Sequence, residues 1–457
     1  MEIVPDQNEL KMRYELEKVY KQDQKLSSLE KIVKVEFLIN IIVGILIITV
    51  IILIVFWRLD LFNLFGNQSA FKSDLQNKPA PERVVLAAER QQAPVFINEQ
   101  SVDIDRAFQA DSGSIRLTSS GNLKKEVFGF LPYWVMTRLG EINLKLLTTV
   151  SYFGLEVDKN GDIIKYDANG KMLSPWFYFQ PGPVFDSFIK KAHSEKIKVQ
   201  VTLKCFNQSN IVSLVTSQTS RKKFIETAVF LVNSRGLDGI NIDFEYIGTP
   251  ASEVRDGFSA LIIELNSELK RQNPNAKLTV DTFVDAASNT RIHDTEILSK
   301  NSDALVIMGY DFHTPESSLA GPVAPMEGYG NSIVGFLGSY LDKVQPEKLV
   351  LAIAYYGYDW PVLESGRNAR TAGGEVNVKI LPYAEIADVT KNTQIQWDEN
   401  GQTPWYQYSD ATGPRVVHFE NTRSLAYKYD YINQKNLQGV GIWALGFDGK
   451  REELLQL

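Results

Sequence analysis

A repeated alternation of strand-like and helix-like segments limits the possible folds of this 457-residue chain more than any other feature. From Glu126 onward, short apolar or alternating runs recur, and each is followed by a stretch with helical periodicity. The runs that predict strands lie at residues 127–134, 148–157, 198–206, 239–245, 277–283, 304–310, 348–356 and 440–445. About eight such units over roughly 250 or more residues predict an α/β fold, a (β/α)8 TIM barrel. A doubly wound open sheet is the alternative, although no glycine-rich phosphate loop follows the first strand.

A second feature is the long segment at residues 361–437, which exceeds a simple connection between the last two predicted strands. Strand-like runs within it predict a small β-rich insertion at about residues 361–420, between strands seven and eight. These runs lie at residues 393–397, 405–408 and 415–419. Residues 422–432 predict the seventh barrel helix.

Two Asn-Gly turns follow the second predicted strand, at residues 158–162 and 167–170. Asn-Gly is a strong hairpin signal, so both segments predict tight turns of a β excursion. The spacing of Asp158, Asn160 and Asp162 also resembles the start of a calcium loop, but the remainder of that loop is missing. A turn is therefore the favoured interpretation.

The N-terminal region contains an uncharged apolar stretch at residues 37–57, close to the ~20 residues needed to cross a bilayer. A cleaved signal peptide and a buried core helix are the alternatives. A signal peptide has a shorter apolar core followed by small residues, whereas Arg58 follows here. More lysines precede the stretch than follow it, so the positive-inside rule places the N-terminus in the cytoplasm.

These observations predict the order of the domains. We expect a cytoplasmic segment at residues 1–34 and a single transmembrane signal-anchor helix at residues 35–57. Residues 58–122, rich in Gln, Ser, Asn and Ala, predict a flexible linker. The barrel, at residues 123–457, would then lie on the extracytoplasmic side of a cell membrane.

The composition argues against several functional classes. A formal net charge of −7, without a basic stripe beyond the N-terminus, speaks against a nucleic-acid partner. Cys205 is the only cysteine, so neither an intrachain disulfide nor a cysteine-based metal site can form. The four histidines show no ligand spacing. They are His193, His293, His313 and His418.

The fourth predicted strand carries the strongest chemical signal. Its apolar residues alternate with Asn241, Asp243 and Glu245, which would face the interior of the barrel. Buried carboxylates cost several kcal/mol unless they are paired or hydrogen-bonded, so such a strand indicates chemistry. Residues two apart on one strand are separated by about 6.6 Å and point to the same side. Two acids placed in this way are unsuited to act from opposite sides of one sugar carbon. One acid can still protonate a leaving oxygen while its neighbour, which raises its pKa, orients another group.

Other strand ends supply aromatic and polar partners at the same rim of the predicted barrel. The sixth strand ends in Tyr310 and Asp311, and the eighth ends near Trp443, which can form a floor for a sugar ring. The first and seventh strands end near three further aromatic residues. These are Tyr133, Trp134 and Tyr356. Each alone could serve barrel packing, but their occurrence at the same ends favours a binding site.

The segment DGINIDFE, together with MGYD, GIWALG and YYGYDW, resembles glycoside hydrolase family 18, the chitinase and endo-N-acetylglucosaminidase family. The resemblance covers about Glu126 to the C-terminus. Within it, residues 404–445 look closest to the peptidoglycan-directed branch that contains spore-cortex glucosaminidases.

The resemblance implies a membrane-anchored hydrolase that cuts β-1,4 bonds in a polysaccharide containing N-acetylglucosamine, by substrate-assisted retaining hydrolysis. Glu245 would be the acid and base, Asp243 would hold the substrate acetamido group, and Tyr310 would hydrogen-bond to it. It also implies no metal and no organic cofactor. Residues expected to bind substrate are Asn241, Asp311, Trp443, Tyr133, Trp134 and Tyr356. The partners expected are this polysaccharide and a lipid bilayer, without nucleic acid.

Two departures from the family pattern lie beneath the predicted catalytic pair. Many relatives carry Asp where this chain has Asn241, and Ser-x-Gly-Gly where residues 202–205 read TLKC. We expect retained activity, altered pH behaviour and a preference away from crystalline chitin. A silent, lectin-like barrel and a passive scaffold of an envelope complex are the alternatives. The presence of Glu245 argues against a lectin, since family lectins commonly lack the acid.

Overall fold

The computed structural model describes residues 124–373, 378–451 and 453–454. The predicted cytoplasmic segment, signal anchor and linker lie outside these residues. Among the helices of the described residues, none combines the length and apolarity that a membrane span requires.

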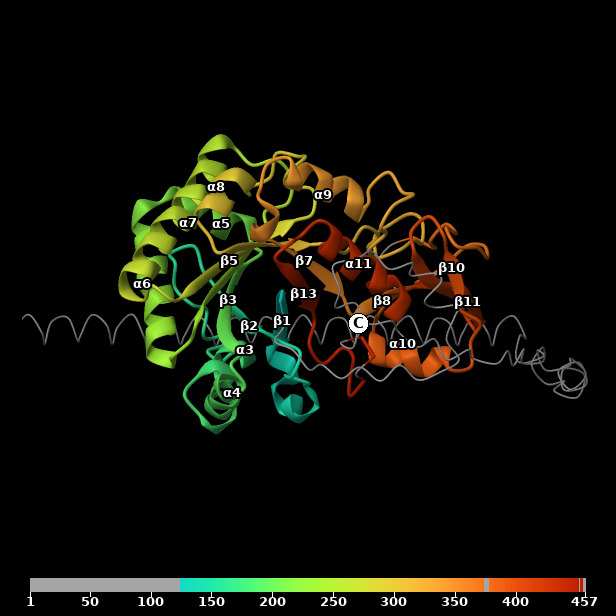
Figure 1. The fold of residues 1–457 in the computed structure, drawn as a ribbon, viewed down its shortest axis with the longest axis horizontal. Helices are drawn as coiled ribbons and strands as arrows, with labels where there is room; N and C mark the ends of the chain where they lie inside the picture. Colours follow the sequence, from blue (N-terminus) through green and yellow to red (C-terminus); the bar gives the residue numbers. More distant parts are fainter. Residues whose placement is uncertain (1–123, 374–377, 452, 455–457) are drawn as a thin grey trace, which may run out of the picture. The chain divides into compact units, whose positions relative to one another are not determined.

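Eight parallel strands close into a barrel in the order β1-β13-β7-β6-β5-β4-β3-β2 (Figure 1). The predicted (β/α)8 barrel is therefore confirmed, and the open-sheet alternative is wrong. The strands are β1 (Glu126–Pro132), β2 (Thr149–Glu156), β3 (Lys198–Cys205), β4 (Gly239–Phe244), β5 (Lys277–Phe283), β6 (Ala304–Met308), β7 (Leu349–Ala354) and β13 (Gly439–Trp443). Gly239 allows the close approach of β4 to β5, because a Cβ there would lie 2.1 Å from the carbonyl oxygen of Lys277.

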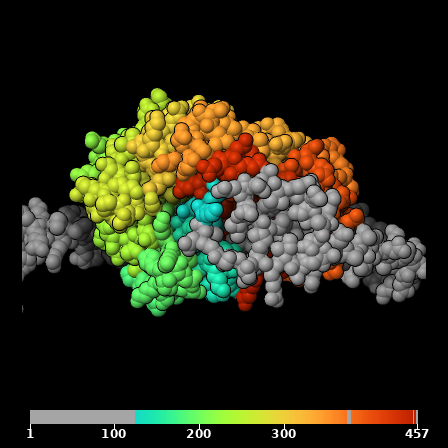
Figure 2. Space-filling view, in the orientation of Figure 1, coloured from blue at the N-terminus to red at the C-terminus, as the bar shows by residue number. Residues whose placement is uncertain are grey.

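Helices surround the barrel. They are η2 (Tyr133–Glu141), α3 (Ser174–Phe179), α4 (Pro183–Ser194), α5 (Gln208–Thr216), α6 (Gln218–Arg235), α7 (Ser252–Gln272), α8 (Thr295–Lys300), α9 (Ile333–Leu341), η3 (Pro346–Lys348) and α11 (Thr422–Gln434). The side chain of Ser217 caps the start of α6, and Gly236, with φ of 62°, ends it. In Figure 2 the green-to-yellow part of the chain, which contains helices α5 to α8, forms the surface on the left of the view.

The outward faces of the strands pack against these helices. On β4, the ring of Phe244 lies 5.8 Å from Phe224 of α6 and 5.8 Å from Phe258 of α7. All three rings are fully buried. Burial of large aromatic side chains contributes strongly to stability. The alternation predicted for this strand is thus confirmed on its apolar side.

The barrel interior has one apolar side and one polar side. Inward residues of β1, β2, β6 and β7 form a buried apolar cluster that includes Phe130, Phe153 and Val306. Inward residues of β3, β4 and β5 are polar or acidic instead, among them Thr202, Asn241 and Asp281. A packed apolar half gives the acidic half a rigid, poorly solvated wall.

A second sheet, of five antiparallel strands, forms the predicted insertion between β7 and β13, in the order β10-β11-β12-β8-β9. Its elements are β8 (Tyr356–Pro361), β9 (Lys379–Pro382), α10 (Tyr383–Thr390), β10 (Gln396–Asp398), β11 (Thr403–Asp410) and β12 (Gly413–His418). The run predicted as one strand at residues 348–356 is in fact divided, because β8 pairs with β12 rather than continuing the barrel. The insertion also contains a buried ion pair, in which Arg415 Nε lies 2.8 Å from Asp359 Oδ1.

The excursion after β2 contains the predicted turns. Bridges join Val157 to Ile163 and Tyr166 to Met172 in antiparallel fashion. Asp158 Oδ1 accepts hydrogen bonds from the backbone N–H groups of Asn160 and Asp162, at 2.8 and 3.0 Å. The carboxylate therefore stabilises a hairpin turn, as favoured from the sequence.

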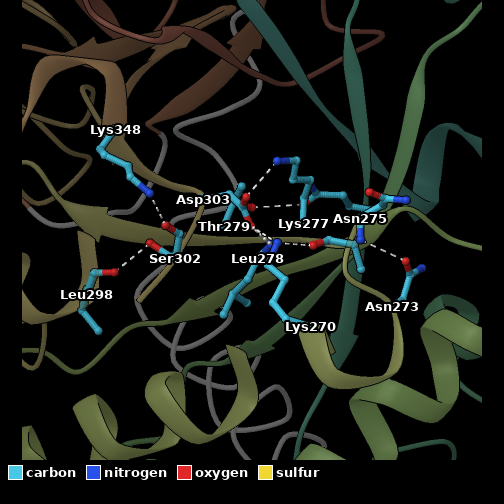
Figure 3. A network of polar contacts seen from close by, with 12 residues as sticks. Lys270, Asn273, Asn275, Lys277, Leu278, Thr279, Leu298, Ser302, Asp303 and Lys348 are labelled. Carbon is cyan, nitrogen blue, oxygen red and sulfur yellow. Dashed lines mark hydrogen bonds and ion pairs between the residues drawn. The ribbon is translucent and has the colours of Figure 1, made fainter. Parts of the chain in front are cut away.

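A polar network closes the amino-terminal end of β5 and β6 (Figure 3). Asp303 Oδ2 accepts from Lys270 Nζ at 2.8 Å and from the backbone N–H of Leu278 at 2.9 Å. Asp303 Oδ1 accepts from Lys277 Nζ at 2.8 Å. Because active sites of these barrels lie at the opposite, carboxyl end, this network indicates a contribution to stability.

Candidate active site

The acids of β4 lie at the carboxyl end of the barrel. Asn241 and Asp243 are 0% and 4% exposed, and Glu245, one residue beyond β4, is partly exposed. The backbone N–H of Glu245 donates a 3.0 Å hydrogen bond to the carbonyl of Cys205, so β3 fixes the position where this residue leaves the sheet. Burial thus decreases from Asn241 toward the rim, as the strand geometry predicts.

Asn241 joins the polar side chains of the layer beneath the acids. Its Nδ2 donates to Asp281 Oδ2 at 2.8 Å and to Thr202 Oγ1 at 3.3 Å. Its Oδ1 accepts from Thr279 Oγ1 at 2.6 Å. Thr202 Oγ1 in turn lies 2.8 Å from Ser151 Oγ. The layer therefore extends across β2, β3, β4 and β5, and Asn241 is suited to support the site from below.

Asp281 of β5 is a site residue that the sequence analysis missed. It is 3% exposed, and two residues before it Thr279 also points inward. The period of two in LTVDTF is the signal that could have identified it. Asp281 Oδ1 and Asp243 Oδ1 are both buried without a hydrogen-bond partner within the described part of the chain.

Burial and like charge raise the pKa values of this acidic group. Burial is the main cause for Asp243, followed by the charges of Asp281 and Glu245, while Lys204 opposes them. Burial also raises the pKa of Asp281; its hydrogen bond from Asn241 acts in the opposite direction. Two buried neighbouring carboxyls resist simultaneous ionisation, so Asp243 and Asp281 favour retention of a proton between them.

The pKa of Glu245 is raised toward neutral pH. Burial first, and the charge of Asp311 second, raise its pKa to about 6, against the opposing charge of Lys204. A group with a pKa near the working pH can both give and take a proton. Glu245 is therefore suited to act as acid and then as base.

Tyr310 and Asp311 lie beside these carboxyls. Burial raises the pKa of the Tyr310 phenol, and the charges of Asp281, Asp243, Asp311 and Glu245 add to the effect, so the phenol stays a hydrogen-bond donor. Asp311 adopts a φ of 59°, which is uncommon outside glycine and often marks functional sites.

The insertion sheet holds Asp311 in this conformation. Its Oδ1 accepts hydrogen bonds from the hydroxyls of Tyr356 and, at 2.8 Å, of Tyr358, both in β8. Burial raises the pKa of Asp311, and these two hydrogen bonds oppose that rise. Tyr356 is only 4% exposed, so it supports Asp311; the substrate contact expected of it stays a prediction.

Trp443 lies at the end of β13 over the apolar half of the barrel. Its ring is 4.5 Å from Phe153 and 5.7 Å from Phe130. Trp134 packs against it at 6.4 Å, and Tyr133 packs against Trp134 at 5.0 Å. Trp134 is 43% exposed, so these rings extend from a buried floor to the surface. Aromatic rings in this arrangement can bind the apolar face of a sugar.

Lys204 occupies the β3 position opposite Asp243 in the β3–β4 register. From the sequence, Lys204 is only part of TLKC, a departure from the family motif, and has no expected role. Its Nζ lies 4.5 Å from the ring of Phe206 and 5.8 Å from that of Phe153, which itself packs on Trp443. The site therefore contains a cation beside its acids and its aromatic floor.

Comparisons with known proteins identify the family of the chain. Residues 126–448 match the model of the glycosyl hydrolases family 18. Rat di-N-acetylchitobiase is 27% identical over 246 residues, which cover 50% of this chain and 66% of the relative. The cortical fragment-lytic enzyme of Bacillus subtilis (strain 168) is 26% identical over 252 residues, covering 53% of this chain and 54% of the relative. The chain thus spans less than two thirds of these relatives, and their similar identities favour neither branch.

Solved structures show the same fold. A family 18 chitinase from Cycas revoluta in complex with (GlcNAc)3 superposes with a TM-score of 0.61 at 20% identity, covering 72% of this chain and 98% of that one. A Group IV chitinase from Ostrinia furnacalis gives 0.62 at 21% identity, with 73% and 98% covered. Because the family model covers most of the barrel, this chain belongs to the glycosyl hydrolases family 18.

Proposed function

We propose that this protein hydrolyses β-1,4 bonds next to N-acetylglucosamine in a polysaccharide, by substrate-assisted retaining catalysis. The observation that carries the proposal is Glu245, whose pKa is raised to about 6, directly beyond the buried Asp243 on one strand face. The family and the (GlcNAc)3 complex of a relative support the same substrate class.

The first half-reaction breaks the glycosidic bond. Glu245 donates its proton to the bridging oxygen, which leaves with the aglycone sugar. The 2-acetamido oxygen of the substrate attacks the anomeric carbon and forms a cyclic oxazolinium ion. Asp243 accepts a hydrogen bond from the acetamido N–H, and its negative charge stabilises the cation. Tyr310 donates its phenolic hydrogen bond to the acetamido oxygen, and Trp443 lies beneath the ring.

The second half-reaction restores the enzyme. Glu245, now a carboxylate, takes a proton from a water molecule whose oxygen attacks the anomeric carbon. The oxazolinium ring opens, the acetamido group is regenerated, and the configuration is retained after two inversions. Glu245 is protonated again for the next turnover. Two acids on one strand face fit this route better than a double displacement, which needs carboxyls on opposite sides of the carbon.

Peptidoglycan and a chitin-like polymer are both candidate substrates. The chitobiase match supports the second, and the Bacillus cortical fragment-lytic enzyme supports the first. We also propose that the chain belongs to the spore-cortex branch of the family, because residues 404–445 resemble that branch most.

Membrane anchorage is also part of the proposal. It is supported by the uncharged apolar stretch at residues 37–57 and by the lysines before it. The expected result is that the full-length chain fractionates with membranes and that protease added outside intact cells degrades the barrel but not an N-terminal tag. Degradation of the tag instead would overturn this orientation.

Hydrolysis is tested with the full-length protein and its Glu245→Gln variant. Both are incubated with chitotetraose and with purified peptidoglycan, and new reducing ends are measured. The wild type should release reducing ends, and the variant should be at least about 10²-fold slower while it still binds the oligosaccharide. Binding without cleavage by the wild type would support the lectin-like alternative and refute the hydrolase.

A further inference from the structure

We propose that Lys204 binds a carboxylate on the sugar next to the cleaved bond, so that the preferred substrate is an N-acetylglucosamine polymer whose alternate sugars are anionic. This inference rests on the proposed function and specifies its substrate class.

Lys204 faces the mouth of the barrel. On β3 the alternate residues Gln200 and Thr202 point inward and are 1% and 0% exposed. Lys204 is the next inward residue, lies opposite Asp243 in register and is partly exposed. It therefore lies at the level of Asp243 rather than in the polar layer below it.

Aromatic rings surround the ammonium group. Its Nζ lies over the ring of Phe206, which is 43% exposed, and near that of Phe153, at 4.5 and 5.8 Å. Phe153 contacts Trp443 at 4.5 Å, so the ammonium lies close to the floor of the site. Contact with ring faces stabilises a cation modestly and leaves its N–H donors available for a ligand.

No close partner among the described residues neutralises the charge of Lys204. Among the described residues, its Nζ has neither a hydrogen bond nor an ion pair within 4.0 Å. It lowers the pKa values of Asp243 and Glu245, but burial and neighbouring acids outweigh it in both cases. The cation thus remains free to pair with a charge that the substrate brings.

The chemistry of a suitable ligand follows from these surroundings. A carboxylate forms strong charge-assisted hydrogen bonds with a lysine that is partly removed from water. Asp243, Glu245 and Asp311 would otherwise repel an anionic sugar, and Lys204 offsets that repulsion. Neutral chito-oligosaccharides have no charge that could pair with Lys204. A glycan whose alternate amino sugar carries a lactyl carboxylate can form this ion pair.

The test separates direct contact from a change in the acidity of Glu245. Three substrates are used: a peptide-free peptidoglycan glycan strand, the same strand with its lactyl carboxylates methyl-esterified, and chitotetraose. Wild-type full-length protein, Lys204→Met and Lys204→Arg are compared by kcat/KM at low ionic strength. Lys198→Met serves as the matched control, because Lys198 is an exposed lysine at the opposite end of the same strand.

We expect the wild type to prefer the free carboxylate to its ester by about tenfold. Lys204→Met should bring this ratio close to one, Lys204→Arg should keep most of it, and Lys198→Met should leave it unchanged. Added salt should reduce the wild-type preference, because it screens a charge pair at the rim. A role limited to the acidity of Glu245 would change the rates on the free acid and the ester equally.

Two results would overturn the inference. One is an equal preference for acid over ester in wild type and Lys204→Met; the other is a wild type that does not distinguish acid from ester. In both cases cleavage of chitotetraose by the wild type would leave the proposed function intact. Failure to cleave any of the three substrates would instead refute the proposed function itself.

Discussion

The side-chain amide of Asn241 donates a 2.8 Å hydrogen bond to the carboxylate of Asp281 on the neighbouring strand. The second buried carboxyl beside Asp243 is therefore on β5. Its charge raises the pKa of Asp243, the residue proposed to hold the acetamido group. We therefore expect Asp281 to be a positioning residue that acts through Asp243.

Exchanging the two side chains tests this relationship. Asp281→Asn alone removes a charge that raises the pKa of Asp243, so the limb of the pH–rate profile governed by Asp243 should move to lower pH. Adding Asn241→Asp restores one buried carboxyl to the same layer and should bring the limb back toward its original position. The measurement is kcat/KM against pH on chitotetraose. A limb that stays in place in the single variant would exclude Asp281 from this role.

The buried carboxyl of Asp281 should also lower the stability of the folded protein at neutral pH. Its folded pKa is raised mainly by burial, above the value near 4 of an unfolded Asp. For an acid with a raised pKa, the folded state is penalised increasingly as the pH rises from the unfolded value to the folded one. Asp281→Asn should therefore raise Tm at pH 7 and change it less at pH 4, as measured by calorimetry. Equal shifts at the two pH values would contradict this assignment.

The acidity of Glu245 gives a third prediction. The charge of Asp311 raises the pKa of Glu245, which is about 6, so Asp311→Asn should lower that pKa. Because Glu245 must be protonated to act as the acid, the alkaline limb of the kcat/KM profile should move to lower pH. Tyr358→Phe is the control, because it removes one hydrogen bond to Asp311 but keeps the carboxylate of Asp311. An unchanged alkaline limb in Asp311→Asn would refute the coupling.

Local periodicity was enough to predict the barrel, the insertion and the inward position of Asp243 on β4. The alternation around Asp243 lies within one strand, so neither neighbouring strands nor barrel closure is needed to recognise it. The hairpin turn at Asp158 is likewise a local signal. The order of the strands also follows from the fold class, because consecutive units of such a barrel are neighbours.

Residues whose role depends on pairing between segments could not be placed in the same way. Asp281 becomes part of the site only because β4 and β5 align Asn241 with Thr279. Tyr356 was predicted at a barrel strand end, whereas it belongs to β8, where it pairs with Pro382 of β9 and donates its hydroxyl hydrogen bond to Asp311. Lys204 appeared only as a missing motif, because its aromatic neighbours come from β2 and from the residue after β3.

The polar network at the other end of the barrel should affect stability rather than the pH dependence of catalysis. Burial acts to raise the pKa of Asp303. The hydrogen bonds that its carboxylate accepts from Lys270, Lys277 and the backbone N–H of Leu278 outweigh burial, so the pKa is lowered (Figure 3). Since the folded pKa lies below the unfolded value near 4, the contribution to stability is complete above that value and disappears as the pH falls through the folded pKa. Asp303→Asn should therefore lower the free energy of unfolding by about 1–3 kcal/mol at pH 7, with a smaller difference at pH 3.

Denaturant unfolding of the full-length protein at both pH values measures this difference. The matched control is Asp388→Asn, in which the lost carboxylate is 61% exposed and pairs with Lys391 and Arg451. Its effect should be small and similar at the two pH values, because exposed ion pairs contribute little. An Asp303→Asn variant as stable as the control at pH 7 would show that the hydrogen bonds around Asp303 do not stabilise the barrel. The proposed catalytic chemistry, at the opposite ends of the strands, would be unaffected by that outcome.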